Sequence, residues 1–97
     1  MQQLAETFPD FSGKYMSITK FGEESRSVEI EDPLFENLGG RIFITGIAPR
    51  GSSKLGWLDG VRVSIAWEQV LEYYVFDDAK TFAKAIHVKA SKEQRGQ

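Results

Sequence analysis

The stretch from Trp57 to Phe76 constrains the fold of this chain more than any other segment, and it contains both tryptophans. Over residues 61–67, V-R-V-S-I-A-W, bulky apolar side chains alternate one by one with smaller or polar ones. A period of two is what a β-strand with one buried and one wetted face requires. A second run rich in strand-forming residues follows at 70–76. The stretch therefore predicts two strands in the core of a small β domain.

Two segments near the start of the domain predict a hairpin. Residues 14–21 and 26–31 are rich in strand-forming side chains and flank a polar turn. Alternation in the second segment places its apolar residues inward and places Glu29 and Glu31 outward, in solvent. We expect this strand to end before Pro33, because proline has no N–H to donate to a neighbouring strand.

The next strand is predicted at residues 41–47, R-I-F-I-T-G-I. It is apolar on both faces, so we expect it near the centre of the sheet. Gly46 is expected to mark a bulge or a tight bend. The preceding segment, residues 34–38, is compatible either with a single helical turn or with a kinked extension of the strand before it.

Ala66 to Val70 predict one tight turn between the last two strands. A strand, a single 3₁₀-like turn and a short strand resemble the ending of small SH3-like and Sm-like barrels, a resemblance of architecture that covers residues 14–76. It implies a mainly β fold with a short C-terminal α-helix. The sheet is expected to be a small antiparallel SH3-like or Sm-like barrel, or a strongly bent sheet, of about five strands.

A short amphipathic helix is predicted at about 78–87. Asp77 or Asp78 suits its N-cap, because an aspartate carboxylate accepts from the free N–H groups of a first turn. Apolar residues then recur at the spacing of one helix face: Ala79, Phe82, Ala83 and Ile86. We expect Phe82 and Ile86 to cover the open end of the barrel.

The chain predicts one domain, because 97 residues with 41% hydrophobic content suffice for a single compact core. We expect the domain over residues 14–87, preceded by an N-terminal arm at 1–13. In this arm Phe8 and Phe11 are expected to cap one end of the core. Residues 88–97 carry no continuing apolar pattern and predict a flexible tail.

Composition excludes several classes of function. The chain has no cysteine, which removes disulfides, thiolate nucleophiles and cysteine-based metal sites. No apolar run reaches the roughly 18–20 residues of a membrane-spanning helix, and the first residues, M-Q-Q-L-A-E, lack the features of a secretory signal. We therefore expect a cytoplasmic protein without a membrane partner.

Catalytic groups are sparse. The single histidine, His87, falls at the predicted end of the helix, where a favourable interaction with the helix dipole is more common than catalysis. Acidic residues gather at Glu29, Glu31, Asp32 and Glu36, and a carboxylate pair there would suit a cation or acid–base chemistry. A solvated outer face is the favoured interpretation. We predict no enzymatic activity, no metal and no cofactor.

The loop at residues 49–57 is the candidate binding site, because its glycines and serines allow backbone N–H groups to converge on an anion. Gly51 and Gly56 have the spacing of the first part of a P-loop. Trp57 and Leu58, however, stand where lysine and serine or threonine are required, which excludes a nucleotide-hydrolysing loop. The predicted binding residues are Arg50, Ser52, Ser53, Lys54, Trp57 and Arg62.

Two functions remain open. The leading prediction is a non-enzymatic small β-barrel that acts as a protein-interaction or self-association module, because the chain has ample strand-forming surface with edges to pair. The alternative is nucleic-acid or anion binding through the basic Gly/Ser loop at 49–57. A net charge of −2 makes nucleic acid the less favoured partner.

Overall fold

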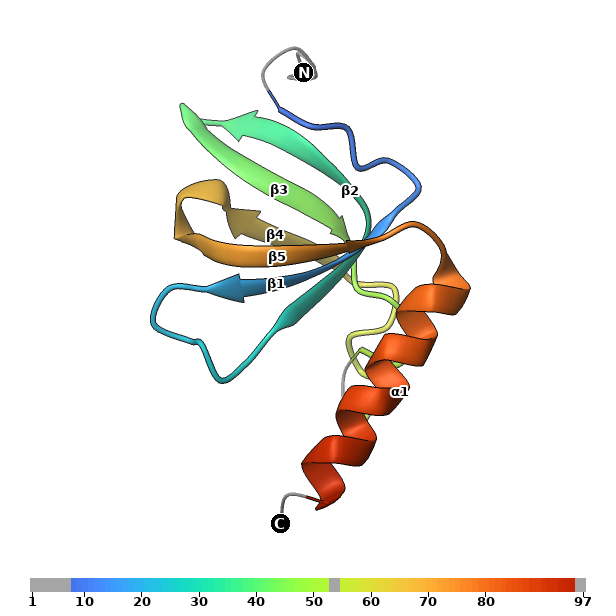
Figure 1. Cartoon of the computed structure of the whole chain (residues 1–97). Coiled ribbons are helices and arrows are strands. Elements are labelled where there is room, and N and C mark those ends of the chain that lie inside the picture. The colour runs from blue at the N-terminus through green and yellow to red at the C-terminus, as the bar shows by residue number, and fades with distance from the viewer. Residues whose placement is uncertain (1–7, 53–54, 96–97) are drawn as a thin grey trace.

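The computed structural model describes residues 8–52 and 55–95, and it consists of five antiparallel strands in one sheet followed by a C-terminal helix (Figure 1). The sheet has the strand order β4-β3-β2-β1-β5. The elements in chain order are β1 (Tyr15–Lys20), β2 (Val28–Leu38), β3 (Arg41–Ile47), β4 (Arg62–Ala66), the 3₁₀ turn η1 (Trp67–Gln69), β5 (Val70–Phe76) and α1 (Ala79–Arg95).

The two outermost strands, β4 and β5, are consecutive in the sequence and are joined only by the three residues of η1. The sheet must therefore curve until one end of each edge comes close to the other (Figure 1). The predicted 3₁₀ turn at this place is confirmed. β4 does not pair with β5 among the described residues, so the sheet stays open and the predicted closed barrel is not confirmed.

β2 continues through Pro33 to Leu38, so the predicted end of this strand was wrong. The reason is a bulge at which the register with β3 shifts between Glu31 and Leu34. Asp32 adopts a positive φ of 53° there, and its carboxylate accepts from the Gly13 N–H at 2.7 Å. Pro33 lies within the bulge, where the pairing is already interrupted. Of the two alternatives for residues 34–38, the kinked extension is the one observed.

Gly46 lets β3 approach this bulge in β2 closely. A Cβ atom at this position would overlap the Ile30 side chain and would lie 2.7 Å from the carbonyl oxygen of Glu31. Real side chains do not tolerate such contacts, so only glycine fits here without a shift of the backbone. Of the two alternatives predicted for Gly46, the bulge is the one observed, and it lies in β2 opposite this glycine.

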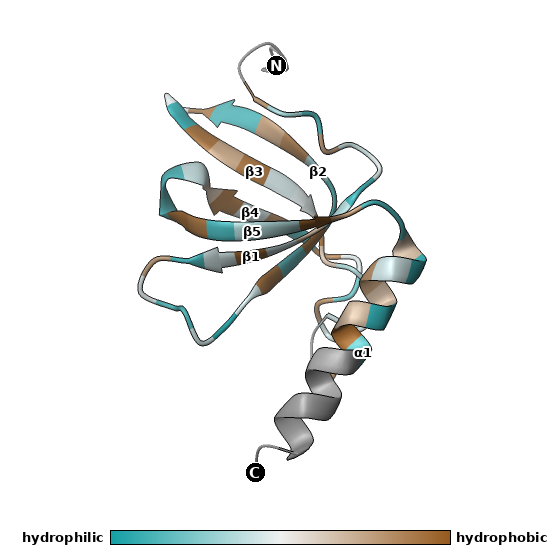
Figure 2. Ribbon diagram, in the orientation of Figure 1, coloured by the Kyte–Doolittle hydropathy of each residue, from teal (hydrophilic) through white to brown (hydrophobic). Residues whose placement is uncertain are grey.

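The core lies on the inner face of the curved sheet. Its fully buried members include Met16, Ile18, Ile30 and Ile44, and hydrophobic and polar residues alternate along the strands, as Figure 2 shows. The segment before β1 adds aromatic rings at one end: Phe8 stacks on Phe35 with ring centroids 4.6 Å apart, and Phe11 is buried. This is the place predicted for Phe8 and Phe11.

Helix α1 begins at an N-cap, Asp78, whose carboxylate accepts from the Thr81 N–H at 2.7 Å. This hydrogen bond lowers the pKa of the Asp78 carboxyl. Phe82 attaches the helix to the sheet, because its buried ring stacks on Tyr15 and meets Phe76 edge-on, at centroid distances of 4.9 and 5.6 Å. No helix within the described residues is long and apolar enough to cross a membrane.

The helix extends to Arg95, well beyond the end predicted near residue 87. The predicted end rested on the apolar pattern of one helix face, and this pattern stops at Ile86. Residues 88–95, V-K-A-S-K-E-Q-R, contain no glycine or proline and are mostly good helix formers, so the helix continues at little cost. The last two residues of the predicted tail lie outside the described residues.

Replacing Gly46 with alanine is expected to destabilise the protein by about 1–3 kcal/mol, because the added methyl group would overlap atoms of β2 at the bulge. Urea denaturation followed by tryptophan fluorescence measures this free energy. Gly46→Val should cost more than Gly46→Ala, because the overlap grows with the side chain. If the free energy of unfolding of Gly46→Ala lay within about 0.5 kcal/mol of the wild-type value, β2 and β3 could separate enough to accept the methyl group, and the prediction would be wrong.

Candidate functional site

The predicted loop site lies between β3 and β4 and is largely open to solvent. Arg50 and Arg62 are exposed, and Trp57 has 73% of its surface exposed. Trp57 is thus the exposed aromatic that a stacking site would need. Two of the predicted binding residues, Ser53 and Lys54, lie outside the described residues.

Two residues of the loop, Gly51 and Ser52, already donate hydrogen bonds to groups of the chain itself. The Gly51 N–H donates to the Asp59 carboxylate at 3.2 Å. The Ser52 N–H and hydroxyl both donate to the carbonyl oxygen of Pro49, at 3.1 and 2.6 Å. An anion from solution would therefore have to displace the chain's own carboxylate. This geometry weakens the anion-binding alternative.

The four clustered acidic residues do not form a common site. The Asp32 carboxylate accepts from the Gly13 N–H, and Glu29 accepts from Ser17 on β1 and from Ser27 in the β1–β2 turn. Within the described ranges, no three or more potential ligands lie together as a metal site. His87 is exposed and lies inside α1 rather than at its end, because the helix continues past it.

Glu29 departs from its predicted place in solvent. It lies on the outer face of the sheet, as the alternation predicts, but only 8% of its surface is exposed. Ser17 is its direct neighbour on β1, and the Ser17 and Ser27 hydroxyls donate to Glu29 Oε2 at 3.0 and 2.6 Å. A carboxylate buried to this degree on an outer face requires cover from other parts of the chain.

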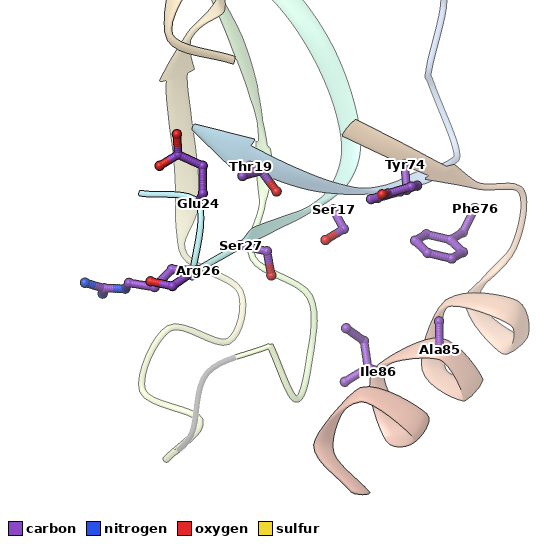
Figure 3. A pocket seen from close by; sticks show the side chains of 10 residues that line it. Ser17, Thr19, Glu24, Arg26, Ser27, Tyr74, Phe76, Ala85 and Ile86 are labelled. Atoms are coloured by element: carbon purple, nitrogen blue, oxygen red, sulfur yellow. The ribbon is translucent and has the colours of Figure 1, made fainter. Parts of the chain in front are cut away.

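That region of the outer face carries a cavity of about 320 Å³ (Figure 3). The β1–β2 turn forms one wall and includes Ser27. β1 and β5 form the floor with Ser17, Tyr74 and Phe76, and α1 closes the other side with Ile86. The volume is near the lower end of the range for ligand pockets, about 300–1,000 Å³.

This cavity was not predicted from the sequence. Its residues come from three elements that are far apart in the chain, and each of them looks ordinary alone. The sequence did carry one signal for it: alternating hydroxyl and carboxylate groups share one face of the predicted hairpin. They are Ser17 and Thr19 in the segment 14–21 and Ser27 and Glu29 in the segment 26–31. Only the docking of α1 over this face turns the run into a cavity.

The outermost strand β5 is exposed along residues 71–75. Tyr73 is opposite Ile18 and Val75 is opposite Met16 in the pairing with β1. Both β1 residues are fully buried, whereas Tyr73 and Val75 each remain 38% exposed. Side chains on the core-facing side of β5 are therefore left uncovered along the unpaired edge of the strand.

Comparison with models of protein families, with curated proteins and with solved structures finds no match for this chain. Function is therefore inferred from the chemistry of three places: the loop at 49–57, the cavity beside Glu29 and the open edge at β5.

Glu29→Ala is expected to destabilise the protein by about 1–3 kcal/mol, because the serine hydroxyls lose their buried acceptor. Glu29→Gln keeps an acceptor oxygen and should cost less. Glu24→Ala, at an exposed position of the adjacent turn, serves as the control and should stay within about 0.5 kcal/mol of wild type. Equal losses for Glu29→Ala and Glu24→Ala in thermal denaturation would contradict a structural role for the buried carboxylate.

Proposed function

We propose that this chain is a non-enzymatic protein-interaction module that self-associates by pairing strands across the open edges of its sheet. The observation that carries the proposal is β5, an outermost strand with five consecutive exposed residues. Two of these, Tyr73 and Val75, lie opposite the buried Ile18 and Met16 and share the core-facing side of the strand. An added strand from another chain would cover them.

Monomeric proteins protect such edges with lysine, proline, bulges or a covering segment. The exposed part of β5 has no lysine or proline, and Glu72 is its only charged side chain. Its register with β1 shifts at Leu71, so the protection there is limited to this irregularity. β5 pairs with β1 on one side, and its other side has no hydrogen-bonded strand among the described residues. An edge of this kind is typical of surfaces that take an additional strand.

A second copy supplies a suitable partner strand, β4, the other outermost strand of the sheet. The only charged residue of β4 is Arg62, and the only one of β5 is Glu72. Pairing β5 with β4 of the next copy combines opposite charges, whereas pairing β5 with β5 would bring two glutamates into one ribbon. Repeated β5–β4 pairing builds a ring or a filament.

We also propose that the sheet has a small SH3-like or Sm-like architecture. Strand order β4-β3-β2-β1-β5 and the 3₁₀ turn between β4 and β5 support a small SH3-like or Sm-like architecture. In such an arrangement the gap between β4 and β5 is the natural place for a neighbouring chain to enter.

Nucleic-acid or anion binding through the loop at 49–57 remains the alternative. The exposure of Arg50, Arg62 and Trp57 favours it, and the Gly51–Asp59 hydrogen bond disfavours it. Salt-dependent binding of a single-stranded oligonucleotide that weakens with Arg50→Ala would speak for this alternative.

The wild-type protein is expected to form oligomers at about 100 µM, and Leu71→Lys should raise their dissociation constant at least about tenfold. A lysine on the edge strand opposes burial against a second strand. Leu38→Lys is the matched control, because Leu38 and Leu71 have 43% and 42% of their surface exposed and Leu38 lies on the interior strand β2. Sedimentation velocity measures the masses. A monomeric wild type, or equal dissociation by both variants, would refute the proposal.

A further inference from the structure

Glu29 is a nine-tenths buried carboxylate without a cationic partner among the described residues. The ion pairs in that part of the chain join Lys14 to Asp77, Lys20 to Glu23 and Arg41 to Glu68. Glutamate is almost never buried to this degree unless it is paired, because a buried charge without a counter-charge is costly. The two serine hydroxyls satisfy the hydrogen bonding of Glu29 Oε2 but supply no positive charge.

The Glu29 carboxylate lies behind the cavity wall: Glu29 does not line the cavity itself, but both of its serine donors do. The Ser17 hydroxyl donates its hydrogen bond to Glu29, so its oxygen can only accept a hydrogen bond from a ligand in the cavity. A ligand that meets this wall must bring donors. A negatively charged ligand would instead meet the lone pairs of Ser17 and the charge of the carboxylate behind it.

The remaining walls suit an alkyl chain that ends in a cation. Tyr74 and Phe76 present aromatic rings, and Ile86 faces them from the helix (Figure 3). Aromatic faces attract ammonium groups, and apolar walls hold a methylene stem. Arg26 also lines the cavity, but Figure 3 shows its side chain directed away from Ser17, Phe76 and Ile86. The positive charge of Arg26 therefore does not fill the space.

We propose that the cavity between the β1–β2 turn, the outer face of β5 and helix α1 binds an alkylammonium group, with Glu29 as the buried counter-charge. The amino head donates to Ser17, the aromatic rings of β5 flank the charge, and the alkyl stem runs along Ile86. A lysine side chain and a free aliphatic amine share this chemistry. This site lies on the outer face of the sheet, so it is independent of the strand pairing proposed for the edge of β5.

The test uses the folded full chain and three probes followed by two-dimensional NMR. The probes are Nα-acetyl-lysine methylamide, a free aliphatic diamine of the same length, and Nα-acetyl-norleucine methylamide as the uncharged analogue. We expect the two amines to bind with dissociation constants of about 0.1–10 mM. They should shift the amide signals of Ser17, Thr19 and Ile86 and leave those of Arg50 and Gly51 unchanged. Tighter binding of the lysine derivative assigns a protein side chain as the ligand, and tighter binding of the diamine assigns a free amine.

Glu29→Gln should weaken binding of the amines at least about tenfold, because the amide keeps the serine hydrogen bonds but removes the charge. Glu24→Gln is the matched control, since Glu24 is an exposed carboxylate on the rim of the same cavity. It should change the affinity less than about threefold. Ile86→Lys provides an independent variant if Glu29→Gln does not fold, because its own ammonium group would occupy the cavity and block the probes.

Three results would overturn the proposal. The first is the absence of amine binding by folded wild-type protein up to about 20 mM. The second is equal binding of the norleucine and lysine derivatives, which would leave no role for the charge. The third is unchanged affinity in folded Glu29→Gln or Ile86→Lys protein. Loss of self-association in Leu71→Lys bears on the edge of β5 alone and leaves this test unaffected.

Discussion

The close approach of β3 to the bulge in β2 is the constraint on which the rest of this structure depends. Gly46 leaves room for the Ile30 side chain and the Glu31 carbonyl, and Asp32 turns the strand through a positive φ. Bulges increase local twist and bend a strand. With this bend, a sheet of five short strands curves far enough for three residues of η1 to connect its two edges. A flat sheet with the same strand order would hold these edges on opposite sides of the molecule.

Curvature also divides the sheet into two chemically different faces. The inner face collects aliphatic side chains and the rings of Phe11 and Phe35. The outer face of β1 and β2 is polar, yet part of it is shielded because α1 docks through Phe82. A buried polar group must find hydrogen-bond partners nearby, and the two serine hydroxyls supply them for Glu29. The unpaired charge that remains is the feature that distinguishes this patch from ordinary surface.

Much of the fold follows from local patterns in the sequence. Alternation locates the strands, and the break between two β-rich runs locates the 3₁₀ turn. The continuation of β2 past Pro33 does not follow, because it depends on a bulge that β3 and Gly13 stabilise from elsewhere in the chain. The burial of Glu29 was equally hidden, since alternation places it on the outer face and its hydrogen-bond donors come from β1 and from the β1–β2 turn. For the loop at 49–57, the sequence identifies exposed groups correctly but cannot show that Asp59 already holds the Gly51 amide.

β5 belongs to two surfaces, because its unpaired edge faces away from β1 while Tyr74 and Phe76 form part of the cavity floor. This seven-residue strand is hydrogen-bonded on one side only, to β1. A neighbouring chain that pairs with its free edge and a molecule that fills the cavity would both contact it. The edge and the cavity floor use different atoms of β5, so each copy in an assembly built through the edge would keep a cavity of its own.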